Sequence, residues 1–212
     1  MSGVEEILAR LQEGNRRFVA GEGRFARRCR PERRLALVGG QRPVAVVLGC
    51  ADSRVPAELI FDQGLGDLFV VRVAGNVVGP TQLGSVEFAV EALGTRLVVV
   101  LGHERCGAVQ AALEVHGGAE APASPHLGEI VARILPAVAQ VQHEPASGRL
   151  SAAVRANVRR SAAALLDGSP LLRRMQAEEG LQVVGAVYDL ATGVVMFLDE
   201  ADAPPAQSSP AQ

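Results

Sequence analysis

Val44-Ala-Val-Val-Leu-Gly49 and Leu97-Val-Val-Val-Leu-Gly102 are the two stretches from which the architecture of this chain follows. Each is a short apolar run, rich in β-branched residues, that ends in glycine. Such runs are typical of strands buried on both faces, as in a parallel sheet covered by helices. The two stretches therefore predict two central strands of an α/β domain.

Candidate metal ligands follow both strands directly. Cys50 opens the string Cys50-Ala-Asp-Ser-Arg54, and His103 and Cys106 delimit His103-Glu-Arg-Cys106. Open α/β sheets place their binding crevice at the carboxyl ends of the strands, so these side chains are expected to meet there. Two Cys and one His leave the fourth position of a tetrahedral zinc ion open, which is the pattern of a catalytic zinc. The alternative is a pair of buried structural thiols beside a hydrogen-bonded core histidine.

Asp52 and Arg54, which follow the first thiol, are expected to be catalytic. Asp52 would bind zinc as a fourth ligand in a closed state, or accept a hydrogen bond from a zinc-bound hydroxide. Arg54 would hold this carboxylate through its planar guanidinium. A solvated surface pair is the alternative. Because two thiolates cancel the charge of the ion, we expect weak acidification of the bound water and activity that rises toward alkaline pH.

Outward from the two central strands, helices and strands are predicted to alternate. Further strands are expected at 67–71, 182–190 and 194–198, the last as an antiparallel edge. Helices are expected at 4–20, 31–38, 56–61, 83–93, 106–115, 127–141, 152–166 and 171–179, with a loop rich in Gly and Arg after the first. The pattern predicts an α/β fold with a mostly parallel four-stranded sheet, an antiparallel edge strand and flanking helices.

A single α/β zinc enzyme domain is expected over residues 1–202, with an N-terminal helical arm at about residues 1–40. The first helix of this arm has an apolar stripe that needs a surface to cover. A second subunit is one source of that surface, which would make the chain an obligate oligomer. The tail at residues 203–212 is expected to be disordered, since it lacks apolar residues able to order it.

Length and composition indicate an ordinary globular protein. The chain has 212 residues, of which 48% are hydrophobic and 21% charged, and its net charge is −2. This balance gives no reason to expect binding to nucleic acid or membrane, and the arginines at residues 27–34 are interpreted as a solvated or interface-facing surface. No apolar run approaches the roughly 20 residues of a membrane span, and no secretory signal is visible. Three cysteines do not indicate a disulfide framework, so the cytoplasm is the expected location.

Taken together, the strings resemble the β-class carbonic anhydrases. The resemblance rests on C-x-D-x-R after one strand, H-x-x-C after another and the intervening Arg72-Val-Ala-Gly-Asn76, and it runs from about residue 15 to residue 198. It implies a zinc-dependent carbonate dehydratase, which converts carbon dioxide reversibly to bicarbonate and a proton by zinc-bound hydroxide. By position, Cys50, His103 and Cys106 match the zinc ligands of the family, and Asp52 and Arg54 match its catalytic dyad.

The resemblance also implies roles for residues outside these strings. Gln63 matches a glutamine that points into the pocket of the neighbouring subunit in similar enzymes. Its amide is expected to hydrogen-bond a substrate oxygen, whereas an exposed turn residue is the alternative interpretation. Arg72 and Tyr188 match two members of a regulatory anion site, although the chain has no Trp to serve as the third.

Two glycines and one asparagine are expected to have structural roles at tight turns. Gly75, Asn76 and Gly107 are expected to serve backbone geometry. Gly107 is also expected to offer its amide hydrogen to an anionic product at the start of a helix.

Other functions and assemblies stay open at this point. Similar proteins with the same ligands hydrolyse carbon disulfide or carbonyl sulfide. A non-catalytic zinc-binding module, in which Asp52 completes a closed tetrahedron, is a second alternative. A thiol redox protein using Cys50 and Cys106 is a third, and the dyad argues against it. Because the family builds its site at a subunit boundary, a homodimer is expected, with a homotetramer as the alternative.

Overall fold

The computed structural model describes residues 3–198 of the chain. The predicted tail at residues 203–212 and the predicted end of the domain at residue 202 lie outside these residues. Within residues 3–198, every helix is too short or too polar to cross a lipid bilayer.

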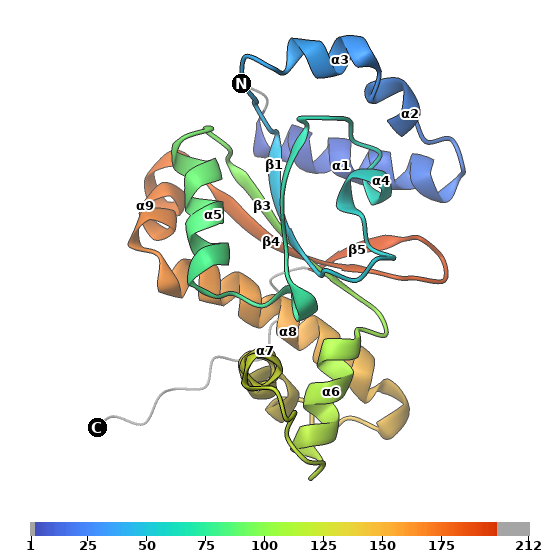
Figure 1. The fold of residues 1–212 in the computed structure, drawn as a ribbon, viewed down its shortest axis with the longest axis vertical. Coiled ribbons are helices and arrows are strands. Elements are labelled where there is room, and N and C mark those ends of the chain that lie inside the picture. Colours follow the sequence, from blue (N-terminus) through green and yellow to red (C-terminus); the bar gives the residue numbers. More distant parts are fainter. Residues whose placement is uncertain (1–2, 199–212) are drawn as a thin grey trace.

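Five strands form one sheet in the order β2-β1-β3-β4-β5. They are β1 (Ala45–Gly49), β2 (Leu68–Arg72), β3 (Leu97–His103), β4 (Gln182–Tyr188) and β5 (Val195–Leu198). The first four strands are parallel to one another, and β5 runs antiparallel along β4 (Figure 1). The predicted fold class is therefore confirmed, and the strand count is five when the antiparallel edge is included.

Alternation along the strands divides the apolar core into two layers. Val46 and Val98 belong to the cluster on one face of the sheet, and Val47 and Val99 belong to the cluster on the other. Every residue of β1 and β3 is buried. The two strands are continuous apolar runs because both of their faces are covered.

Helices cover both faces of the sheet (Figure 1). One face carries α5 (Pro80–Glu91), α8 (Ala146–Gly168) and α9 (Pro170–Glu179), while α6 (Gly107–His116) and α7 (Pro125–Ala139) pack against α8 beyond the ends of the strands (Figure 1). The other face carries α1 (Val4–Val19) and α4 (Ala57–Ile60). Two short helices, α2 (Phe25–Arg28) and α3 (Pro31–Ala36), continue the chain from α1.

The first helix packs on its own chain. Leu11 of α1 is fully buried in the cluster that contains Val47 and Val99 of the central strands. The Asn15 side chain accepts the Val195 N–H at 2.9 Å and donates to the Gly193 carbonyl at 2.9 Å, which ties α1 to the β4–β5 hairpin. Within one chain the apolar stripe of α1 is covered only in part, because Val4, Ile7, Leu8 and Phe18 are partly buried, and the expected contact with a second subunit stays a prediction.

Two helices depart from the prediction. Helix α2 lies in the segment predicted as a loop, where the Arg24 N–H donates to the buried carboxylate of Asp62 at 2.5 Å. Such a tertiary contact has no local sequence signal. Helix α8 begins at Ala146, six residues before its predicted start at Ala152, because Ser147 and Gly148 are weak helix formers that hide the first turn.

Candidate metal centre

The candidate ligands lie at the carboxyl ends of β1 and β3. The parallel register aligns Gly49, the last residue of β1, with Leu101 of β3, so that Cys50 follows β1 beside the end of its neighbour. His103 is the last residue of β3, and Cys106 is the N-cap of α6. The strand ends thus bring the two strings together as predicted for an open parallel sheet.

The distances between the donor atoms suit one shared ion. One donor atom each from Cys50, His103 and Cys106 lies within 4.8 Å of the others, and all three residues are buried. The two Sγ atoms are 4.0 Å apart. Two thiolates held at about 2.3 Å from a tetrahedral zinc ion would be about 3.8 Å apart. The observed spacing is close to that value.

His103 is oriented to bind a metal through Nε2. Its Nδ1 lies 2.9 Å from the Glu104 carbonyl oxygen, which accepts the Nδ1 hydrogen when the ring carries it there. Nε2 is buried and has no hydrogen-bond partner among the described residues. An orphaned buried nitrogen costs free energy, and a metal ion would remove that cost. A second ring nitrogen bonded to a carbonyl is also usual for metal-binding histidines, so the residues present fit zinc.

Backbone N–H groups surround both sulfur atoms. Those of Gly75 and Asp52 donate to Cys50 Sγ with N···S distances of 3.4 and 3.5 Å. Amides of the first turn of α6 donate to the sulfur of Cys106. The side-chain hydrogen bond from Cys106 lowers the pKa of the Cys50 thiol to about 4, and the same contact raises the pKa of Cys106. The first of the two thiol protons is therefore lost more easily than the second, and a bound metal ion would displace the proton that remains.

Asp52 and Arg54 form a two-point ion pair beside the cluster. Arg54 Nε donates to Asp52 Oδ1 at 2.9 Å, and Arg54 Nη2 donates to Oδ2 at 2.7 Å. These hydrogen bonds hold the pKa of the Asp52 carboxyl well below its usual range. Oδ2 lies 3.9 Å from His103 Nε2. An ionised carboxylate therefore faces the cluster with both of its oxygens held by Arg54.

The segment between β2 and α5 carries the backbone geometry predicted for Gly75 and Asn76. Both residues have positive φ angles, 69° and 45° respectively. A Cβ atom on Gly75 would lie 2.7 Å from Ile134 Cδ1. Gly107 differs, because its φ is not positive and the space at its Cβ position is open. As the first residue of α6 it has no acceptor for its N–H within the helix, and its binding of an anion stays a prediction.

Gln63 is held inside its own chain. The side chain is fully buried, accepts a hydrogen bond from Arg10 Nε at 2.8 Å and donates to the Phe61 carbonyl at 2.7 Å. It is therefore not the exposed turn residue of the alternative interpretation. Its action on a neighbouring subunit stays a prediction.

Arg72 and Tyr188 do not lie on neighbouring strands. Arg72 ends β2 and Tyr188 ends β4, with β1 and β3 between them. The Arg72 guanidinium donates to the carbonyl oxygens of Cys50, at 2.9 Å, and Asp52. Tyr188 is buried and its ring packs 6.5 Å from that of Phe18. One chain therefore does not place the two side chains side by side, and the regulatory anion site stays a prediction.

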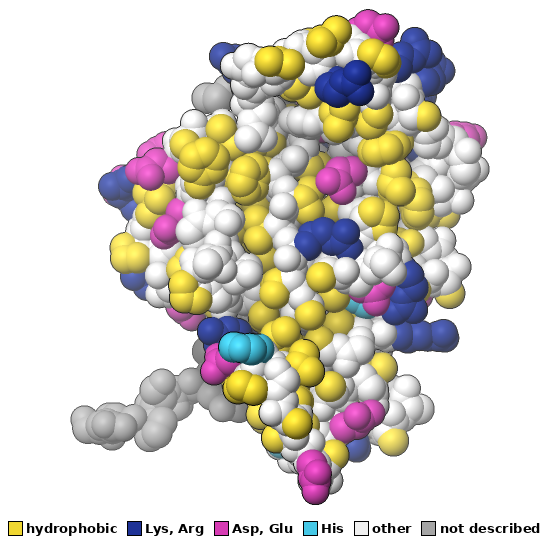
Figure 2. Space-filling model, viewed as in Figure 1, with side chains coloured by type: hydrophobic (Ala, Val, Ile, Leu, Met, Phe, Trp, Pro, Cys, Tyr) yellow, Lys and Arg dark blue, Asp and Glu magenta, His cyan; other side chains and the backbone are white. Residues whose placement is uncertain are grey.

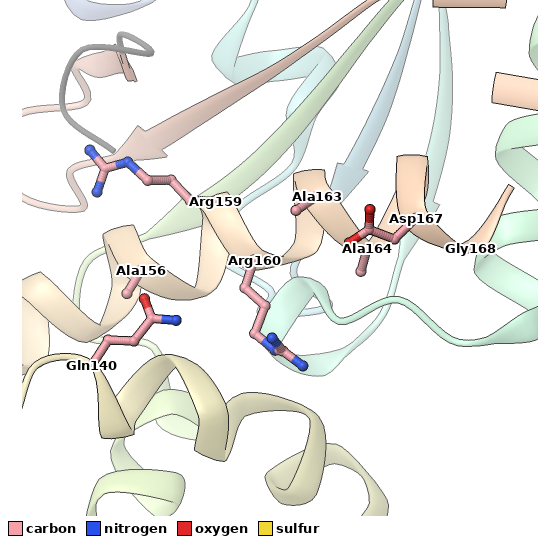
Figure 3. Close-up of a pocket in the computed structure, with 8 residues that line it drawn as sticks. All are labelled: Gln140, Ala156, Arg159, Arg160, Ala163, Ala164, Asp167 and Gly168. Carbon is pink, nitrogen blue, oxygen red and sulfur yellow. The ribbon is translucent and has the colours of Figure 1, made fainter. Parts of the chain in front are cut away.

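A surface hollow of about 610 Å³ lies away from this cluster, between the end of α7 and the outer side of α8 (Figure 3). Gln140, Arg160 and Asp167 line it together with small residues, and Arg159 and Arg160 extend from α8 in different directions. None of its lining residues is one of the predicted site residues.

The sheet and the three-donor cluster define an α/β protein with a candidate Cys₂His metal centre at the strand ends. A family model described as carbonic anhydrase matches residues 45–195. The chain belongs to the β-carbonic anhydrase family.

Relatives and solved structures agree with this assignment. Carbonic anhydrase 2 of Mycobacterium tuberculosis (strain CDC 1551 / Oshkosh) is 42% identical over 189 residues, which cover 89% of this chain and 90% of the relative. The carbonic anhydrase of Mycolicibacterium smegmatis is 43% identical over 185 residues, covering 87% and 88%. The solved β-carbonic anhydrase CcaA matches with a TM-score of 0.73 at 27% identity, covering 96% of this chain and 94% of that one.

A further solved structure comes from a study of two tetrameric β-carbonic anhydrases of Sordaria macrospora. It matches with a TM-score of 0.71 at 27% identity, covering 79% of this chain and 86% of that one. These matches favour a carbonic anhydrase over a carbon disulfide or carbonyl sulfide hydrolase.

Sequence reasoning missed the residues of α8 that support the ligand loops. Ser151 donates to the Glu104 carboxylate at 2.7 Å, and Asn157 donates to the Gly75 carbonyl at 2.8 Å. One signal was present for Asn157, since it lies on a predicted helix between the apolar residues Val154 and Val158. Nothing in the sequence around Asn157 indicates that it contacts the loop containing Gly75.

Proposed function

We propose that this protein is a carbonic anhydrase that catalyses the reversible hydration of carbon dioxide to bicarbonate and a proton, with zinc as its cofactor. The observation that carries the proposal is the convergence of Cys50, His103 and Cys106 within 4.8 Å beside the carboxylate of Asp52. Three donors leave one position of a tetrahedral ion for water, which a closed structural site would lack.

Cys50, His103 and Cys106 would hold the metal. The hydrogen bond from His103 Nδ1 to the Glu104 carbonyl fixes the ring so that Nε2 is free to bind. The N–H groups on the two sulfurs stabilise them as thiolates. When bound, zinc acidifies a coordinated water and so supplies the nucleophile for carbon dioxide.

Asp52 would orient the attacking water by accepting its hydrogen bond. The carboxylate is ionised and both of its oxygens are held by Arg54, so it is aimed before substrate arrives. Direct binding of Asp52 to the metal would require one oxygen to leave Arg54. The geometry of the pair therefore supports an open resting site, with the closed state reached only when this ion pair breaks.

Two further residues would contact substrate or product. The Gly107 N–H lies at the start of α6, where the helix dipole favours the bicarbonate anion. Gln63 would act on the pocket of a neighbouring subunit, as in the similar enzymes. Its amide would first have to exchange its contacts with Arg10 and Phe61 for contacts with substrate.

Stopped-flow measurement of carbon dioxide hydration, with zinc content determined on the same samples, tests the proposal. Cys106→Ala removes a donor and is expected to lose zinc and activity together. Asp52→Ala is expected to keep its zinc and to lose activity by at least about 100-fold. Cys29→Ser is the matched control, because Cys29 is a thiol outside the cluster, and it should keep both properties.

Two outcomes would contradict the proposal. A zinc-loaded wild type that is inactive at alkaline pH would favour a non-catalytic zinc module. Release of sulfide from carbonyl sulfide or carbon disulfide, without hydration of carbon dioxide, would favour the hydrolase alternative.

Activity is expected to rise toward alkaline pH. Two thiolates would reduce the effective charge of a bound zinc ion, so the pKa of a coordinated water would lie above the value of roughly 7 found where the ligands are neutral. The pH dependence of the hydration rate measures this. A profile that is flat from mildly acidic pH upward would contradict the expectation.

A homodimer or homotetramer acting in the cytoplasm completes the proposal, with residues 1–202 as its single domain. Hydrophobic side chains are exposed over α3, α4 and α5 on the face shown in Figure 2, and Leu35, Leu59 and Phe88 are exposed residues of these helices. Such exposed apolar surface supports subunit contact. All three cysteines are free thiols, which suits a reducing compartment. Sedimentation of the purified protein tests the assembly.

A further inference from the structure

A buried amide on α8 reaches the loop behind Cys50. Asn157 is 1% exposed, and its Nδ2 donates to the Gly75 carbonyl oxygen at 2.8 Å. Gly75 in turn donates its own N–H to Cys50 Sγ at 3.4 Å. A side chain more than one hundred positions away in the chain is thus connected to a candidate metal ligand through a single residue.

Gly75 is suited to this contact by its backbone. Its φ of 69° lies in the left-handed region, where only glycine is free of strain. A Cβ atom there would also lie 3.1 Å from Ala108 Cβ, at the start of α6. Because glycine has many accessible conformations, the hydrogen bond from Asn157 to its carbonyl favours the one observed here, in which the Gly75 N–H points at Cys50 Sγ.

The surroundings of Asn157 do not otherwise favour an amide. Its neighbours Val154 and Val158 are buried in the apolar core, and both would contact a Cβ atom placed on Gly102 of β3. Asn is also a poor helix former compared with Leu or Ala. A buried amide in this position costs free energy unless it is hydrogen-bonded, and the bond to the Gly75 carbonyl meets that need.

We propose that Asn157 is a positioning residue of the metal centre, which holds Gly75 so that its N–H points at the sulfur of Cys50. The inference rests on the proposed metal site. An N–H bonded to a thiolate withdraws electron density from sulfur and fixes its direction, so the donor strength of Cys50 toward the ion depends on this contact.

Cobalt(II) in place of zinc provides the test, because its thiolate charge-transfer absorption reports the electron density on sulfur. In Asn157→Leu the contact to Gly75 is lost while the branched shape of the side chain is kept. The charge-transfer band is expected to move to longer wavelength than in the wild type. Release of the metal to a chelator is expected to be about 10–100-fold faster, the usual effect of losing a partner behind a metal ligand.

Two further variants distinguish the positioning of Gly75 from a general loss of packing around α8. Ser161→Ala removes another buried polar group of α8 and keeps the contact between Asn157 and Gly75, so its band and release rate should equal those of the wild type. Asn157→Ala loses the same hydrogen bond with a smaller side chain, and it should shift the band in the same direction as Asn157→Leu.

The outcomes are distinguishable. A wild type with a thiolate–cobalt band and Asn157 variants with the same band and release rate would overturn this inference alone. An equal shift in Ser161→Ala would also overturn it, because loss of packing would then explain the effect. A wild type that binds no cobalt through sulfur would overturn the metal site and this inference with it.

Discussion

Arg54 controls Asp52 through both charge and geometry. Its guanidinium holds both carboxylate oxygens and keeps the pKa of Asp52 well below the ordinary value of about 3.9. Arg54→Gln removes this partner, so the pKa of Asp52 should rise toward that value yet stay far below 7. Asp52 therefore stays ionised, and the expected loss of activity, roughly 10–100-fold, comes from lost orientation. Stopped-flow rates relative to the wild type should show the same deficit at about pH 7 and about pH 9. Recovery of the variant at the higher pH would contradict this explanation.

The N-terminal half of α8 supports the turn between His103 and Cys106. Ser151 donates to the Glu104 carboxylate at 2.7 Å, and the Glu104 carbonyl accepts the hydrogen of His103 Nδ1. Ser151→Ala releases the Glu104 side chain, so zinc should pass to a chelator about tenfold faster. The free energy of unfolding should fall by only about 1 kcal/mol. Ser85→Ala is the matched control, since its hydroxyl bonds to Thr81 within α5, and it should release zinc at the wild-type rate. Equal release from Ser151→Ala and the wild type would show that the turn does not need this contact.

A buried ion pair fastens the N-terminal arm to the rest of the molecule. Asp62 is 1% exposed and accepts from Arg17 Nε at 2.7 Å and from the Arg24 N–H. Asp62→Asn keeps the shape of the side chain and suits its φ of 46°, but it removes the buried negative charge beside Arg17, which then faces only the half-exposed carboxylate of Glu13 at 3.7 Å. The free energy of unfolding, measured with urea, should fall by about 3 kcal/mol. Glu129→Gln breaks an exposed pair with Arg133 and should cost less than about 1 kcal/mol. Similar losses in the two variants would mean that the arm is not anchored at Asp62.

Local patterns in the chain were enough to predict the sheet and the convergence of the three candidate ligands. Val44–Gly49 and Leu97–Gly102 have the composition of strands covered on both faces, and the structure buries every residue of β1 and β3. Cys50 follows β1 directly and His103 is the last residue of β3, so the parallel arrangement of the sheet brings them to one edge. Such features depend on residue type and spacing along a few consecutive positions, which a sequence displays in full.

Contacts between distant segments became known only from the folded chain. Neither the burial of Gln63 under Arg10 nor the placement of α1 on its own sheet has a signal in neighbouring residues. The link from Asn157 through Gly75 to Cys50 likewise joins three elements that are far apart in the sequence. Composition and periodicity determine which residues form strands. The sequence also shows directly which metal-ligating side chains stand at the ends of those strands. The partners of each buried polar group depend on how helices pack across the sheet, because a hydrogen bond requires an approach within about 3 Å that no local pattern specifies.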